Sequence, residues 1–169
     1  VIYEAIGHCY DRLNDYANAR FYYKKASHLN TSDSQLIFKI ACTYMNEAQW
    51  TSAIKFLETA MRMYKQQPDF NLAMGQCYME LNKHDEAIIY FGNVVRLKPK
   101  NVNGWLELLK CLYKETLFND ALVYVDFAYE QTEAKPIFLY YKSAIQFALG
   151  KSKEGLLQLD IAMKIGRAS

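Results

Sequence analysis

The sequence predicts an all-α fold, a right-handed α-solenoid (superhelix) of about ten antiparallel helices paired in five helix–turn–helix repeats. The first reason is a phrase of fourteen residues that recurs at intervals of 34: IGHCYDRLNDYANA begins at residue 6, IACTYMNEAQWTSA at 40 and MGQCYMELNKHDEA at 74. The second is that apolar residues inside each repeat recur at spacings of three and four, which is typical of one face of an α-helix. The third is that no segment alternates between apolar and polar residues for long enough to form a strand.

Each repeat divides into two helical halves joined by a short polar turn. In the second repeat, Ile40 and Tyr44 mark the apolar face of the first half, and Ala53 and Leu57 mark that of the second. The turns of the first, third and fifth repeats contain RLND, MELNK and FALGKSK. Proline occurs at the junctions between repeats, where it ends or opens a helix without breaking a hydrogen-bond ladder; the prolines are Pro68, Pro99 and Pro136. We therefore expect helices of about 12–15 residues.

Small residues at fixed positions explain why the repeats pack against one another. Two helices joined by a short turn approach closely only where glycine or alanine faces a bulky side chain. In the first repeat, Gly7 and Ala19 leave the space that Tyr10 and Tyr23 fill. Because one helix pair cannot bury both of its faces, each repeat packs on the next. We expect repeats at 1–33, 34–67, 68–101, 102–135 and 136–169, within a single domain. Since the chain opens with valine rather than methionine, we expect it to be an excised part of a longer protein.

Composition and charge exclude several classes of function. Hydrophobic residues make up 51% of the chain and charged residues 22%, so the chain is expected to fold. Twenty basic and 18 acidic side chains give a net charge of +2, which is too balanced for a nucleic-acid partner. No apolar run approaches the ~18 residues of a membrane span, so we expect no membrane partner.

The cysteines and the known catalytic motifs give no indication of a chemical site. The cysteines are Cys9, Cys42, Cys77 and Cys111; they form no C-x-x-C pair, and three of them recur in phase with the repeat. Cysteine in phase with a packing repeat acts as a small buried hydrophobic residue, so we predict packing roles rather than a metal site or a disulfide. No phosphate-binding loop, H-E-x-x-H or G-x-S-x-G motif occurs. We expect no cofactor, no metal, no enzymatic activity and a cytoplasmic location.

The residues at the repeated positions resemble those of the tetratricopeptide repeat (TPR) family. In the first repeat the resemblance rests on Tyr3, Ile6, Gly7, Tyr10, Ala19, Tyr23 and Ala26. In later repeats it rests on Gly75, Tyr78, Ala87, Phe91, Pro99 and Trp105. It covers essentially the whole chain. The departures, which predict less regular packing in the second half, are Leu109, Lys142, Gln146 and Gly155.

The resemblance implies a scaffold that binds a protein or peptide in a concave groove lined by the first helix of each repeat. Residues seven apart on such a helix share a face. The predicted groove residues are Phe38, Cys42, Met45, Leu72, Gln76, Met79, Leu106, Lys110, Tyr113, Tyr140 and Phe147, with Ala144 between the last two. The matching places of the first repeat hold the polar residues Glu4, His8 and Asp11. The same apolar stripe is expected if neighbouring first helices simply pack together, so both interpretations stay open.

Two functions therefore remain: a protein-interaction scaffold, or a structural, assembly or regulatory segment of a larger protein with no independent ligand. An RNA-binding helical repeat needs a regular polar code, which Cys42, Gln76, Lys110 and Ala144 do not form. The lysine–asparagine–arginine set by which chaperone-binding relatives grip a terminal carboxylate is also missing from the corresponding positions. Because apolar residues at both ends lack a neighbouring repeat, we also expect further repeats, a capping helix or self-association through the ends.

Overall fold

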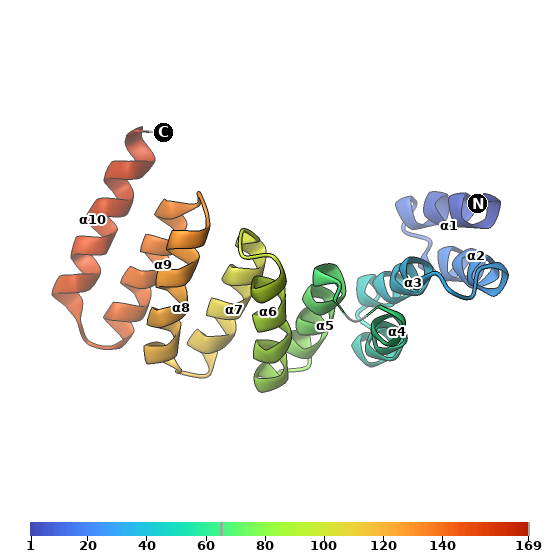
Figure 1. Ribbon diagram of the computed structural model, residues 1–169, viewed down its shortest axis with the longest axis horizontal. Coiled ribbons are helices and arrows are strands. Elements are labelled where there is room, and N and C mark those ends of the chain that lie inside the picture. The colour runs from blue at the N-terminus through green and yellow to red at the C-terminus, as the bar shows by residue number, and fades with distance from the viewer. Residues whose placement is uncertain (65, 169) are drawn as a thin grey trace. The chain divides into compact units, whose positions relative to one another are not determined.

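The structure is a computed structural model that describes residues 1–64 and 66–168. Within these residues the chain forms ten α-helices and no strand, which confirms the all-α prediction (Figure 1). In chain order the helices are α1 (Ile2–Arg12), α2 (Tyr16–Leu29), α3 (Ser34–Asn46), α4 (Trp50–Met63), α5 (Pro68–Glu80), α6 (His84–Leu97), α7 (Val102–Lys114), α8 (Phe118–Gln131), α9 (Lys135–Ala148) and α10 (Ser152–Ala168).

The contacts between helices divide the chain into two compact halves. The N-terminal half is Val1–Lys83 and contains α1 to α5, and the C-terminal half is His84–Ser169 and contains α6 to α10. In the N-terminal half each helix packs against the next one along the chain, and α3 also contacts α5. In the C-terminal half α6 packs on α7, α7 on α8, α8 on α9 and α9 on α10. The expectation that the whole chain is a single domain stays a prediction.

The turn inside each helix pair has the same backbone geometry every 34 residues. One residue of each turn adopts the left-handed conformation, with φ between 55° and 75°; these residues are Asn14, Ala48, Asn82, Thr116 and Gly150. The next N–H donates back to a carbonyl of the preceding helix, as from Asp15 to the Tyr10 carbonyl at 2.9 Å. This is the Schellman arrangement, which satisfies carbonyls that the end of a helix leaves without partners. The polar turns predicted from the sequence are therefore confirmed as helix stops.

Side-chain caps and prolines start several of the helices. The Asp33 carboxylate accepts hydrogen bonds from the N–H groups of Gln35 and Leu36, at 2.9 and 3.2 Å, where α3 begins. Asn101 caps α7 in the same way. Proline opens α5 and occupies the first turn of α9, and Pro99 lies between α6 and α7. The predicted positions of the prolines at junctions are confirmed.

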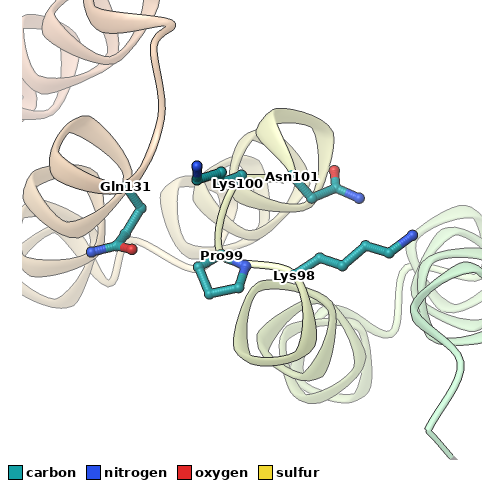
Figure 2. A pocket seen from close by; sticks show the side chains of 5 residues that line it. All are labelled: Lys98, Pro99, Lys100, Asn101 and Gln131. Atoms are coloured by element: carbon teal, nitrogen blue, oxygen red, sulfur yellow. The ribbon is translucent and has the colours of Figure 1, made fainter.

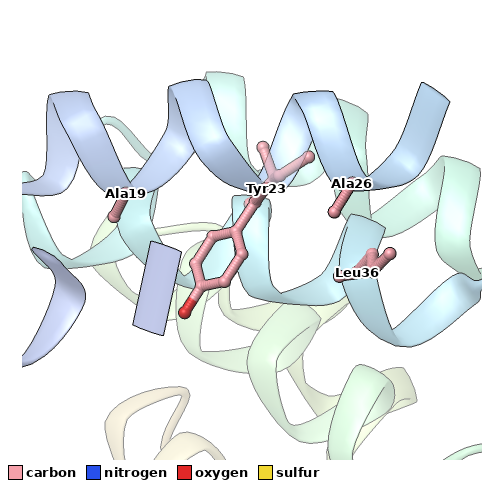
Figure 3. Close-up of a cluster of buried hydrophobic side chains, with 5 residues drawn as sticks. Ala19, Tyr23, Ala26 and Leu36 are labelled. Carbon is pink, nitrogen blue, oxygen red and sulfur yellow. The ribbon is translucent and has the colours of Figure 1, made fainter. Parts of the chain in front are cut away.

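The core of the N-terminal half lies where α2 packs on α1 and α3. Figure 3 shows Tyr23 projecting from α2 and Ala26 facing Leu36 of α3, within a buried cluster that Tyr10 also contacts. A Cβ atom added to Gly7 would lie only 2.7 Å from Cδ1 of Tyr23. Helix α1 therefore reaches its position on α2 because residue 7 has no side chain. The predicted glycine–tyrosine pairing is confirmed.

The departures from the repeat pattern in the C-terminal half have compensating contacts. Lys142, at a place that is apolar in earlier repeats, pairs with Asp126 of α8 at 2.5 Å. Gly155 stands where earlier repeats have alanine, and an added Cβ would lie 3.1 Å from the Phe147 ring. Leu109 and Gln146 are both buried. The helices α9 and α10 pack closely together, so these substitutions are accommodated within a regular helix pair.

Candidate functional site

In the N-terminal half, most of the predicted groove residues are packed rather than open. The half-buried ones are Phe38, Cys42, Met45, Leu72 and Met79, whereas Gln76 is exposed. The Phe38 and Phe70 rings have centroids 4.8 Å apart, and Phe70 is fully buried. Phe38 therefore joins α3 to α5 as a packing residue, which is the second interpretation that the sequence left open.

The cysteines have free thiols, and three of the four are covered by protein. Burial raises the pKa of the Cys42 thiol to about 11, with a smaller contribution from the charge of Asp11. Burial likewise raises the pKa of Cys77 and of Cys111 to about 12, so these thiols stay protonated at neutral pH. The predicted packing role is wrong for Cys9, which is exposed. The physical reason is that α1 packs chiefly on α2, whereas α7, which carries Cys111, packs on both α6 and α8.

The C-terminal half presents open aromatic rings at the predicted groove positions. Tyr113 on α7 is 42% exposed, and Tyr140 and Phe147 on α9 are 59% and 41% exposed. Lys110 is exposed as well, and the remaining two predicted positions are half-buried. We call this set the α7–α9 face; it comprises Leu106, Lys110, Tyr113, Tyr140, Ala144 and Phe147.

Each open ring of the α7–α9 face is supported on one side by a neighbouring group. Tyr113 meets the Phe118 ring edge-on, with centroids 5.2 Å apart. Tyr140 meets Tyr141 edge-on at 6.2 Å, and Phe147 lies over the bare backbone of Gly155. Rings held in this way present a rigid apolar surface to solvent, which is the kind of surface that proteins use to bind other proteins.

The charges on and around this face are few. The Lys110 ammonium lies 2.8 Å from the Glu107 carboxylate, and that hydrogen bond raises the pKa of Lys110. Tyr141 of α9 lies close enough to add to the rise, so α7 and α9 come near each other at this point. Because Glu107 compensates the lysine, the surface is mainly apolar and aromatic.

The first helix of the chain is polar where the sequence predicts a polar start. Glu4 pairs with Lys39 of α3 at 2.7 Å, and this hydrogen bond and charge lower the pKa of the Glu4 carboxyl. Sequence periodicity did not indicate a second link, in which Arg20 pairs with Glu47 at 2.7 Å and stacks over the Tyr44 ring at 4.5 Å. Both links join the first helix pair to the second. A search for opposite charges at equivalent positions of neighbouring repeats is the signal that finds such pairs.

A pocket of about 550 Å³ opens in the C-terminal half beside the turn between α6 and α7. Figure 2 shows Gln131, at the end of α8, opposite this turn, while Lys98 extends away from it. The polar groups of the turn are already used: Asn101 caps α7, and the Pro99 carbonyl accepts a hydrogen bond from the Trp105 indole at 2.7 Å. The pocket has a suitable size for a small ligand but lacks converging polar groups, and it shares no residue with the α7–α9 face.

Metal-binding and membrane-spanning features were searched for throughout the part of the chain that the structure describes. In that part no cluster of three or more histidine, cysteine or acidic side chains is arranged to hold a metal ion. None of the described helices is long and apolar enough to span a bilayer.

The folded chain is thus a tandem array of helix pairs that carries an apolar face on the first helices of its C-terminal half. A family model described as anaphase-promoting complex, cyclosome, subunit 3 matches residues 12–94. The BBSome complex member BBS4 of Bos taurus is 23% identical over 167 residues, which is 99% of this chain. The chain spans only 31% of the length of that relative.

Several solved structures share this arrangement. YrrB, described as a TPR protein with an unusual peptide-binding site, matches with a TM-score of 0.79 and 20% identity over 96% of this chain and 84% of its own. MamA matches with a TM-score of 0.85 and 14% identity over 96% and 95% of the two chains. MamA from Desulfovibrio magneticus RS-1 matches with a TM-score of 0.84 and 11% identity over 99% and 95%.

These likenesses show that the chain has the tetratricopeptide-repeat fold, as the repeated residues predict. Proteins with this fold are generally protein-interaction scaffolds and are typically not enzymes.

Proposed function

We propose that this chain is a protein-interaction module whose C-terminal half binds an extended or helical segment of another protein on the α7–α9 face. The observation that carries this proposal is the exposure of three aromatic rings, those of Tyr113, Tyr140 and Phe147, each more than two-fifths open to solvent. Large, rigid aromatic side chains provide most of the binding energy in protein interfaces. Two relatives are described in terms that support the proposal: YrrB has a peptide-binding site, and BBS4 is a member of a protein complex.

The composition of the face defines the chemistry of its ligand. The rings favour a segment that presents leucine, methionine or aromatic side chains, since these groups gain most by leaving water. Lys110 is compensated by Glu107, so the face has little net charge to attract a strongly charged segment. Binding should therefore depend only weakly on salt.

The alternative is that the stripe serves only to pack the chain as a structural or assembly segment of a larger protein. Two contacts favour it: the Phe38 ring packs on Phe70, and the Phe147 ring covers Gly155. The chain also spans less than a third of BBS4. Tyr140, which has the most exposed ring of the face, distinguishes the two functions because its removal costs little packing.

The test begins with peptides selected from a displayed random library against the whole chain. Each selected peptide is titrated against wild type, Tyr140→Ser and Tyr113→Ser, with Met163→Ser, an exposed apolar residue of α10, as the matched control. The proposal predicts that each tyrosine substitution weakens binding by about 1–3 kcal/mol. The control should leave affinity unchanged, and the melting midpoint of each variant is recorded beside it.

The outcomes separate binding from packing. Weakened affinity with an unchanged midpoint supports a binding face. Unchanged affinity together with a lowered midpoint would assign the rings to packing and refute the proposal. Failure to select any peptide that depends on Tyr113 or Tyr140 would also refute it.

A further inference from the structure

The outward side of α8 carries large apolar side chains that the fold does not bury. Val123 is 55% exposed and Phe127 is 50% exposed. Tyr124 is exposed beside them, and its ring centroid lies 6.5 Å from that of the buried Trp105. The buried side of the helix is formed by other residues, namely Ala121, Val125 and Ala128. We call Val123, Tyr124 and Phe127 the α8 ridge.

The neighbouring second helices repeat this exposure at equivalent positions. Ile89 of α6 and Leu157 of α10 lie 34 residues before and after Val123, and both are more exposed than it is. Apolar side chains placed in phase on the outward side of successive helix pairs form no part of the packing that defines the repeat. Contiguous exposed apolar surface on a folded protein typically marks an interaction site.

Acidic side chains stand at both ends of the α8 ridge. Asp120 lies three residues before Val123, and Glu130 lies three residues after Phe127, so the four share one side of the helix. Helix α8 contains no lysine or arginine. Its third acid, Asp126, pairs with Lys142, whereas among the described residues Asp120 and Glu130 have no ion-pair partner. The ridge therefore has an apolar middle and two uncompensated negative ends.

We propose that the α8 ridge is a second docking surface, which receives an amphipathic helix of a partner protein with large apolar side chains in its middle and lysine or arginine at both ends. The stripe from Asp120 to Glu130 is about 15 Å long, which matches roughly three turns of a partner helix. The apolar middle provides affinity, and the acidic ends select basic partners and speed their approach. The surface lies on second helices and shares no residue with the α7–α9 face.

The test uses a displayed library of short helical peptides selected against the whole chain. Binders that also recognise the Phe127→Ser chain are removed, and the remaining clones are sequenced and titrated. We expect them to carry basic residues on both sides of an apolar stripe. Their affinity should fall about tenfold or more with Val123→Ser, and it should fall as salt rises.

Charge reversal then tests the acidic ends. In a chain with Asp120→Lys and Glu130→Lys, the selected basic peptides should bind more weakly, and versions with glutamate at their ends should bind more tightly. The matched controls are Leu29→Ser in the N-terminal half and Tyr140→Ser on the α7–α9 face. Neither should change the affinity of these peptides. If Phe127→Ser lowers the melting midpoint, the charge-reversed chain provides the same selection without removing an apolar side chain.

Three outcomes would overturn the proposal. One is that no clone depends on the α8 ridge. A second is that the dependent clones are acidic or uncharged at their ends. The third is that the chain sediments as a dimer which Phe127→Ser dissociates, because this would assign the ridge to a second copy.

Discussion

At the scale of single residues, the absence of a side chain decides how closely two helices approach. Gly7 is buried against the Tyr23 ring, whereas Gly92 of α6 has open space at its Cβ position. The same residue type therefore has opposite consequences at two helical positions, and only the contact across the helix pair distinguishes them.

We predict that Gly7→Ala lowers the free energy of unfolding by about 1–3 kcal/mol, because the new methyl group overlaps the Tyr23 ring. Gly92→Ala is the matched control, and it should raise stability by up to about 1 kcal/mol because alanine favours a helix. Urea unfolding of both variants gives the values. Equal effects of the two substitutions would mean that α1 does not approach α2 as closely as described.

The turn residues make a second prediction at this scale. Thr116 is β-branched and has a φ of 57°, a conformation that costs an L-residue roughly 1–2 kcal/mol. Thr116→Gly should therefore stabilise the chain by about 0.5–1 kcal/mol, after the flexibility of glycine in the unfolded chain is allowed for. The reciprocal change, Gly150→Ala at a φ of 75°, should destabilise it by about 1 kcal/mol. Thermal unfolding measures both, and the same sign for the two changes would contradict the shared turn geometry.

At the scale of helices, ion pairs join consecutive helix pairs in addition to apolar packing. Glu4 on α1 reaches Lys39 on α3, and Asp126 on α8 holds Lys142 on α9. In the second case the pair allows a charged residue to occupy a place that earlier repeats fill with an apolar side chain. The lysine places its apolar stem in the packed region and its ammonium at the surface.

The link between α1 and α3 predicts a pH dependence. Lys39 lowers the pKa of Glu4 below its usual 4.5 in the folded chain, so the stabilisation is fully present above that value and is lost as the pH falls through the lowered pKa. Both side chains are more than a third exposed, so the pair is worth at most about 1 kcal/mol. Unfolding by urea from pH 6 to pH 3 should show a smaller loss of stability for Glu4→Gln than for wild type. Parallel curves would contradict the link.

At the scale of the whole molecule, each helix makes its main contacts with its neighbours along the chain. Stability in such an array is approximately a sum of local terms, so a defect is felt most strongly near its own position. This has a measurable consequence for hydrogen exchange.

We predict that Gly7→Ala speeds amide exchange in α1, α2 and α3 while exchange in α9 and α10 stays as in wild type. Gly155→Ala is the reciprocal variant, because its methyl group meets the Phe147 ring and should speed exchange in α9 and α10 only. Exchange measured by mass spectrometry on peptic peptides resolves these regions. A uniform increase along the chain in either variant would show that it unfolds as one cooperative body.

The sequence by itself determined the helices, their pairing, the turns between them and the residues that pack inside each pair. It did so because every repeat has to meet the same geometric demand, and a demand met every 34 residues is visible as small, bulky and turn residues in phase. Gly7 opposite Tyr23, and the left-handed residues at Asn14 and Asn82, belong to this class.

Only the tertiary structure decided which predicted groove residues are open. Phe38 and Tyr140 occupy related positions on first helices, yet Phe38 packs on Phe70 while Tyr140 projects to solvent. Periodicity cannot separate them, because it reports the direction of a side chain on its own helix and not what the neighbouring helix places there. The pairing of Lys142 with Asp126 and the exposed ridge on α8 depend in the same way on residues brought together across helices.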